Sequence, residues 1–174
     1  MHAPITFAPD GSDNPNKGQG KRRRDLCTLP QTDRSLPDVT DKSSHLATGI
    51  LKGCYDNNFF TRGTWNAEFV AGMEPQDGDI IIKGKRGLDA FPGTDLEEHL
   101  VENNIKTVVL GGLLTNCCVE STMRTAFEKG FNVVTLKDCT AATSEEGQKA
   151  AVEGTWGMFS TPMTKDEFVE AINS

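Results

Sequence analysis

The chain has 174 residues and a formal net charge of −7, with 25 acidic residues against 18 basic ones. This length suits one domain with a hydrophobic core, so we predict a single domain over residues 1–174. The acidic balance argues against a nucleic-acid partner. No apolar run approaches the roughly 18 residues that cross a membrane, so no membrane partner is predicted either.

Five cysteines are spread along the chain: Cys27, Cys54, Cys117, Cys118 and Cys139. Their odd number and irregular spacing argue against a disulfide framework and favour a reducing compartment, so we predict a cytoplasmic location. Neither a CxxC pair nor a His-x-x-x-His spacing is present. The sequence therefore predicts no metal and no other cofactor.

The first quarter of the chain differs in composition from the rest. Residues 8–43 are rich in Asp, Asn, Gly, Pro, Ser, Lys and Arg and contain few apolar positions, which predicts a long polar loop. Short helices are predicted next, within residues 45–54 and 64–73. A regular alternation of apolar strands and helices begins only after them.

Three apolar runs predict buried strands: DIIIKG at 79–84, KTVVLGG at 106–112 and NVVTLKD at 132–138. A fourth, short strand is predicted near residues 158–160. Each of these runs is only a few residues long and is bounded by polar or glycine-containing segments, as expected for strands that are buried on both faces of a sheet.

Helices are predicted between these strands. Thr94, with Glu97 three residues later, predicts a capped helix start, and the next helix is predicted to end at Gly130. Thr143 and Thr164 are the predicted N-caps of two further helices. This order of elements predicts an α/β fold, a three-layer α/β/α arrangement around a parallel sheet.

Two adjacent cysteines follow the second of these strands, at the sheet edge where α/β proteins bind ligands. With Thr115 or Asn116 as N-cap, Cys117 and Cys118 would lie in the first helical turn, whose free N–H groups stabilise a thiolate or an oxyanion. The alternative is that both cysteines are small apolar residues that pack a helix onto the sheet. A third hypothesis is a redox sensor in which they form a reversible disulfide.

Positive charges follow the first predicted strand at the same edge of the sheet. Lys83, Lys85 and Arg86 could supply the charge that stabilises a thiolate, or they could be solvated side chains at a strand end. The residue pattern by itself does not distinguish Lys85 from its neighbours.

Three stretches closely resemble the isochorismatase-like cysteine hydrolase family, which includes nicotinamidases and N-carbamoyl amide hydrolases. GKRGLDAFPGTDLEEHL at 84–100 resembles the family's lysine segment, and GGLLTNCCVEST at 111–122 resembles its nucleophile segment. DCTAATSEE at 138–146 resembles the segment that follows. The resemblance covers roughly residues 60–170, and it implies an isochorismatase-like, Rossmann-like fold.

The resemblance assigns roles by position. It implies that Cys118 is the nucleophile and that Lys85 stabilises its negative charge. It also implies a cis peptide bond between Leu113 and Leu114, which would turn the N–H of Leu114, together with that of Cys118, toward an oxyanion. Cys117 would then be a packing neighbour.

The implied activity is hydrolysis of a C–N bond in a small amide or ureide, by a homo-oligomer. Trp65 and Phe91 are the candidates for the substrate pocket, with core packing as the alternative for Trp65.

MHAPITF, at the start of the chain, resembles the end of the family's second strand. The first strand and helix, with the family's catalytic Asp, are therefore expected to be missing from an N-terminally truncated chain. The alternative function is a catalytically impaired or non-catalytic member with a binding or oligomeric role.

Overall fold

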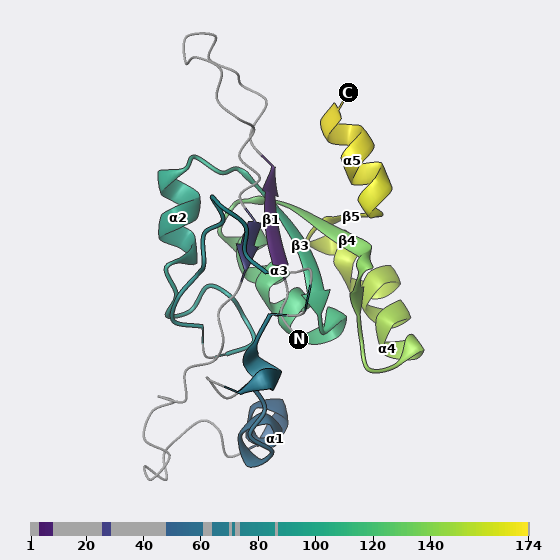
Figure 1. Cartoon of the computed structure of the whole chain (residues 1–174). Coiled ribbons are helices and arrows are strands. Elements are labelled where there is room, and N and C mark those ends of the chain that lie inside the picture. Colours follow the sequence, from purple (N-terminus) through teal and green to yellow (C-terminus); the bar gives the residue numbers. More distant parts are fainter. Residues whose placement is uncertain are drawn as a thin grey trace.

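The computed structural model describes residues 4–8, 26–28, 48–60, 64–69, 71, 74–85 and 87–173. Its strands are β1 (Pro4–Ala8), β2 (Leu26–Thr28), β3 (Thr107–Leu113), β4 (Asn132–Ala141) and β5 (Thr161–Met163). They form one sheet in the order β2-β1-β3-β4-β5, in which β3, β4 and β5 run parallel (Figure 1). The predicted α/β class with parallel strands is confirmed. β1 and β2 run antiparallel to their neighbours and extend the sheet on the other side of β3.

The helices include several short or irregular segments, labelled η. They are α1 (Gly49–Asp56), η1 (Trp65–Ala67), α2 (Leu96–Glu102), η2 (Thr115–Val119), α3 (Glu120–Glu128), α4 (Glu145–Lys149), η3 (Ala150–Thr155), η4 (Trp156–Met158) and α5 (Lys165–Asn173). The predicted polar loop at 8–43 lies outside the described residues, apart from Ala8 and β2. The described helices are too short or too polar to cross a membrane.

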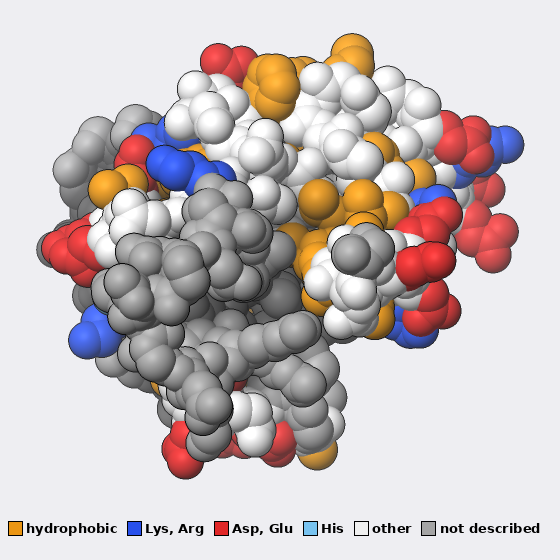
Figure 2. Space-filling model, turned by 90° about the horizontal axis from the view of Figure 1, so that it is seen from above, with side chains coloured by type: hydrophobic (Ala, Val, Ile, Leu, Met, Phe, Trp, Pro, Cys, Tyr) orange, Lys and Arg blue, Asp and Glu red, His pale blue; other side chains and the backbone are white. Residues whose placement is uncertain are grey.

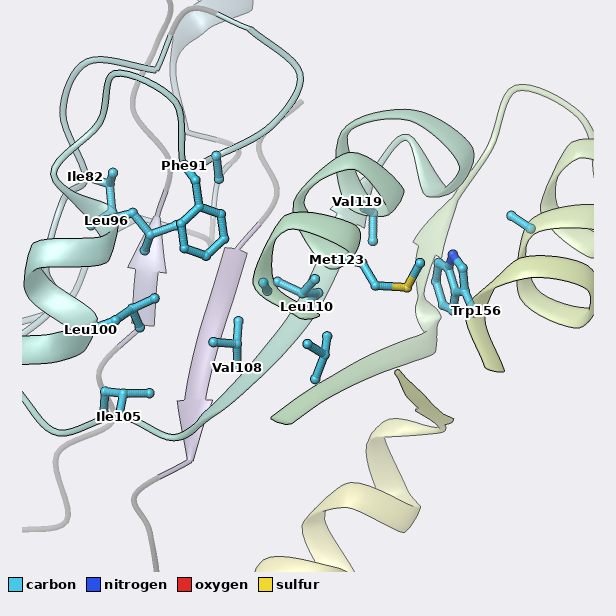
Figure 3. Close-up of a cluster of buried hydrophobic side chains, with 14 residues drawn as sticks. Ile82, Phe91, Leu96, Leu100, Ile105, Val108, Leu110, Val119, Met123 and Trp156 are labelled. Atoms are coloured by element: carbon cyan, nitrogen blue, oxygen red, sulfur yellow. The ribbon is translucent and has the colours of Figure 1, made fainter. Parts of the chain in front are cut away.

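The main hydrophobic core lies between the sheet and helices α2 and α3 (Figure 3). Val108 and Leu110 alternate with Val109 along β3, so they point to the helical face of the sheet. Leu96 and Leu100 of α2 are almost completely buried, which confirms that they share one apolar face. This packing anchors β3 against the helices, and the cysteine pair follows its carboxyl end.

No strand forms at residues 79–84, where the sequence predicts one; Ile81 alone makes an isolated β-bridge. The run is nevertheless partly buried, because Ile82 packs in the core. The N–H of Lys83 donates to the side chain of Asp95 at 2.7 Å instead of to a strand. Gly84 then takes a positive φ of 87°, which turns the chain away from an extended course.

The starts of α2, α4 and α5 agree with the sequence to within one residue. The predicted N-cap of α5 is confirmed as part of a capping box, because the N–H of Thr164 donates to Glu167 at 2.6 Å and the N–H of Glu167 donates to Thr164 Oγ1 at 3.2 Å. The N-caps of α2 and α4 are Asp95 and Ser144, each one residue later than predicted.

The surface reflects the acidic composition of the chain. On the face shown in Figure 2, carboxylate side chains are most numerous at the right-hand edge and also occur at the left and lower edges, and the Lys and Arg side chains that are described are scattered. Hydrophobic side chains form small groups between them.

Candidate active site

The cysteine pair lies in the turn that joins β3 to α3. β3 ends at Leu113, the peptide bond between Leu113 and Leu114 is cis, and η2 follows directly. Cys117 and Cys118 are both partly buried within η2. We call residues 113–119 the nucleophile turn. It stands at the carboxyl end of a central parallel strand, which is the edge where open α/β sheets bind ligands.

The backbone of the nucleophile turn restricts which N–H groups could bind a substrate. The N–H groups of Cys117 and Val119 both donate to the carbonyl of Leu114, at 3.1 and 3.2 Å. Neither is therefore free to bind an oxyanion, and the N–H of Cys118 lies between them. The residue before η2 is Leu114, so the predicted N-cap at Thr115 or Asn116 is wrong, and the hydroxyl of Thr115 makes a different contact.

The structure brings Lys85 to the cysteine pair. Burial lowers the pKa of its ammonium group, while the nearby sulfur atoms of Cys118 and Cys117 and the carboxylate of Asp89 act in the opposite direction. The ammonium donates to the backbone carbonyls of Leu88 and Gly87, at 2.7 and 2.5 Å. A positive charge is thus held in a partly buried position beside the thiol groups.

Two contacts of the segment after Lys85 fix it against α3. Asp89 accepts a hydrogen bond from the hydroxyl of Thr125 at 2.6 Å, and the N–H of Ala90 donates to the hydroxyl of the buried Thr122 at 3.1 Å. Asp89, Thr122 and Thr125 were not predicted from the sequence as site residues. The sequence feature that could have identified the two threonines is their spacing, because residues three positions apart lie on one face of a helix.

Cys117 is not equivalent to Cys118. Burial raises the pKa of Cys117 to about 11, and the neighbouring sulfur of Cys118 adds to this, whereas Lys85 opposes it. Near neutral pH, Cys117 is therefore protonated and a poor nucleophile. The raised pKa of Cys117 favours a packing role for this residue, as the resemblance implies.

A third cysteine lies near this site. Burial raises the pKa of Cys54, on α1, and the thiol of Cys118 raises it further. Cys54 and Cys118 are 64 positions apart along the chain (118 − 54). No local pattern could have shown their proximity, because only the tertiary fold brings α1 to the nucleophile turn.

The two pocket candidates have very different surroundings. Phe91 is 6% exposed and belongs to the hydrophobic core, where its ring stacks on Phe131 with the centroids 6.2 Å apart. The side chain of Trp65, on η1, is 83% exposed, so the alternative that it packs in the core is wrong. The structure thus gives Phe91 a packing role and leaves Trp65 accessible to a ligand.

Gly84 shows how closely the lysine segment is packed. A Cβ atom at this position would lie 2.2 Å from the carbonyl oxygen of Gly93, and φ is 87°. We expect Gly84→Ala to lower the free energy of unfolding by about 3 kcal/mol or more, because the backbone must move and the left-handed conformation is strained. Thermal or urea unfolding measures this loss.

Gly87→Ala is the matched control for that substitution. Gly87 lies in the same segment, a Cβ atom added to it would meet no heavy atom within 4 Å, and its φ is not positive. We expect its unfolding free energy to stay within about 0.5 kcal/mol of the wild type. Equal losses for both variants would show that the close approach to Gly93 does not matter.

Among the residues that the structure describes, no group of His, Cys, Asp and Glu side chains is arranged to hold a metal ion. The site chemistry that these residues offer is that of a thiol, an ammonium group and backbone N–H groups. The absence of a cofactor stays a prediction.

Comparison with known proteins identifies similar chains. The family described as "Isochorismatase domain" matches residues 40–167. The ureidoacrylate amidohydrolase RutB of Variovorax paradoxus is 37% identical over 134 residues, which are 75% of this chain and 52% of the relative. The chain spans about half the length of the curated relatives it matches.

Two solved structures extend the comparison. An isochorismatase-like hydrolase from Alkaliphilus metalliredigens is 36% identical with a TM-score of 0.62, over 65% of this chain and 61% of that one. The nicotinamidase PncA from Bacillus subtilis is 28% identical with a TM-score of 0.55, over 60% of this chain and 61% of that one. Both proteins are therefore similar to this chain in sequence and in backbone fold.

Proposed function

The chain belongs to the isochorismatase family, and we propose that it is a cysteine hydrolase that cleaves a C–N bond of a small amide or ureide. The observation that supports this proposal is that Cys118 lies after the carboxyl end of β3, near enough to the partly buried ammonium group of Lys85 for its sulfur to raise the pKa of that group. A fixed positive charge beside a thiol favours the thiolate, which is the reactive form of cysteine.

The proposed reaction begins at the carbonyl carbon of the substrate. The sulfur of Cys118 attacks this carbon, an S–C bond forms, and the carbonyl oxygen becomes an oxyanion. The N–H of Cys118, with that of Leu114, would donate to the oxyanion, since the N–H groups on either side of Cys118 are already paired. The Lys85 ammonium group stabilises the negative charge.

The C–N bond then breaks. The nitrogen takes a proton from water, which balances the proton that the thiol released to water when the thiolate formed, and leaves as ammonia or an amine, while a thioester to Cys118 remains. Water hydrolyses the thioester, which returns the thiol and releases the acid. Two steps with modest barriers thereby replace the direct hydrolysis of an unreactive amide.

The class of substrate follows from the relatives. RutB of Variovorax paradoxus is named for the hydrolysis of a ureidoacrylate, and PncA of Bacillus subtilis is named as a nicotinamidase. A small ureide or primary amide is the common chemistry of these names. Trp65 is the pocket candidate that stays accessible, and its indole could stack on a planar carbamoyl or amide group. The cytoplasmic location and the homo-oligomer stay predictions.

Partial alkylation tests the proposal. The protein is treated near neutral pH with less iodoacetamide than thiol, peptide mass spectrometry maps the label, and ammonia release from N-carbamoyl compounds and primary amides is measured on the same samples. We expect Cys118 to react first, because partial burial raises the pKa of Cys54 and Cys117, and partial loss of hydration together with the nearby carboxylate of Asp138 raises the pKa of Cys139. Hydrolysis should fall in proportion to the labelled fraction of Cys118.

The proposal has two ways to fail in this experiment. Label spread equally over the cysteines would show that Cys118 is not activated. Full hydrolysis by protein whose Cys118 is alkylated would show that another group does the chemistry. Cys139 serves as the internal reference, since it is exposed and lies on β4.

A further inference from the structure

The side-chain amide of Gln148, on the short helix α4, reaches the nucleophile turn. Its Oε1 accepts a hydrogen bond from the hydroxyl of Thr115 at 2.5 Å and another from the N–H of Ala142 at 3.0 Å. Thr115 is completely buried and is the first residue of η2, three positions before Cys118. The amide oxygen therefore fixes the start of the nucleophile turn from outside that turn.

The nitrogen of the same amide contacts β4 at an irregular point. It lies 3.4 Å from the carbonyl oxygen of Lys137, and 3.5 and 3.3 Å from the carbonyl and hydroxyl oxygens of Thr140. On β3, the paired residues Leu110 and Gly112 are two steps apart. Their partners on β4, Thr135 and Thr140, are five steps apart, so β4 bulges between them. The amide N–H groups point at carbonyls in this bulge.

The backbone of α4 also approaches the nucleophile turn closely. A Cβ atom on Gly147 would lie 3.2 Å from the side-chain nitrogen of Asn116 and 3.3 Å from the hydroxyl of Ser144. α4 therefore supports both Thr115, through Gln148, and Asn116, through the close approach of Gly147. These are the two residues immediately before the cysteine pair.

We propose that Gln148 is a positioning residue that holds Cys118 in place. One amide joins the buried Thr115 to the bulge of β4, and both lie at the carboxyl end of the parallel strands. Gln148 acts through Thr115 and does not touch the reacting atoms. This role rests on the proposed hydrolase function, because Lys85 can stabilise the sulfur of Cys118 only if the turn keeps that sulfur beside it.

Gln148→Glu tests the role with almost no change in shape. A carboxylate still accepts from Thr115 and Ala142, but it cannot donate to the carbonyls of Lys137 and Thr140. We expect kcat to fall about 10- to 100-fold with KM within about threefold, because a misplaced nucleophile slows chemistry more than binding. Glu146→Gln, the reverse exchange at an exposed position of the same helix, should leave kcat within about twofold.

Two substitutions of Thr115 separate positioning from folding. Thr115→Val keeps the buried volume and removes the hydroxyl, whereas Thr115→Ser keeps the hydroxyl and removes a buried methyl group. A positioning role predicts that Thr115→Ser retains kcat within about threefold and that Thr115→Val loses about 10-fold or more, whichever variant unfolds at the lower temperature. Activity that simply follows the unfolding temperature would overturn the proposal. These two Thr115 variants test the positioning role even if Gln148→Glu does not fold.

Labelling with iodoacetamide keeps the role of Gln148 separate from the proposed function. The rate at which Cys118 is alkylated needs no substrate, so it can be measured in every variant even if no amide or ureide is hydrolysed. Slower labelling of Cys118 in folded Gln148→Glu and Thr115→Val, with Cys54 unchanged, supports the positioning role. Unchanged labelling of Cys118 in both variants would overturn it.

Discussion

Replacing Cys118 with alanine is expected to reduce hydrolysis by about 10⁴-fold or more, because covalent catalysis without its nucleophile keeps only the effect of substrate binding and oxyanion stabilisation. Stability should change little, since the side chain is only partly buried and removing one sulfur leaves no charged group unpaired. Steady-state ammonia release measures the rate, and thermal unfolding shows that the variant is folded.

Cys117→Ala is the matched control, because it removes the same atom from the adjacent position of the same turn. The pKa of Cys117 is raised to about 11 by its burial, so it is fully protonated near neutral pH. We expect Cys117→Ala to retain hydrolysis within about fivefold. If the losses of the two variants were similar, the assignment of Cys118 as the nucleophile would fail.

The redox-sensor hypothesis is tested by the same two variants. A reversible disulfide between Cys117 and Cys118 would make the wild type lose activity in mild oxidant and regain it with a reductant. Cys117→Ala should then resist that reversible loss. Loss that is equally reversible without Cys117 would exclude the vicinal disulfide as its cause.

Local patterns predicted the elements whose signal lies in neighbouring residues. β3 and β4 are β-branched apolar runs, and the reciprocal cap of Thr164 and Glu167 involves residues three positions apart. The run at 79–84 has the same apolar character, but its N–H at Lys83 pairs with the side chain of Asp95. Composition shows that a segment is buried, and it does not show which distant group will take its hydrogen bonds.

Some residues of the candidate site could be predicted from the sequence, and others could not. The position of Cys118 at the end of a strand could be predicted from the strand and the helix that flank it. The choice of Lys85 over Lys83 needed a resemblance and stays a prediction; in the structure Lys83 is exposed, whereas Lys85 is partly buried and near the thiols. Cys54 and Gln148 could not be predicted, because their contacts with the nucleophile turn depend on how α1 and α4 pack.

Lys85→Met is the second substitution with a large expected effect. Methionine has a similar length and no charge, so the oxyanion and the thiolate lose their positive neighbour. We expect kcat/KM to fall about 10²- to 10³-fold, the usual cost of removing one group that stabilises developing charge. Lys85→Arg keeps the charge, but a planar guanidinium cannot reproduce the contacts with the carbonyls of Gly87 and Leu88. It should therefore recover only part of the loss.

The pH dependence of stability tests independently whether the side chain of Lys85 is held in a buried position. Burial lowers the pKa of Lys85 below its ordinary value of 10.5, so between the two values the unfolded chain binds more protons at this position than the folded chain. Stability contributed by this group therefore rises with pH through that window, and Lys85→Met should remove the rise. Urea unfolding of both proteins across the alkaline range measures the difference. An equal pH dependence for wild type and variant would mean that Lys85 is not held in a buried site, and its role beside Cys118 would lose its physical basis.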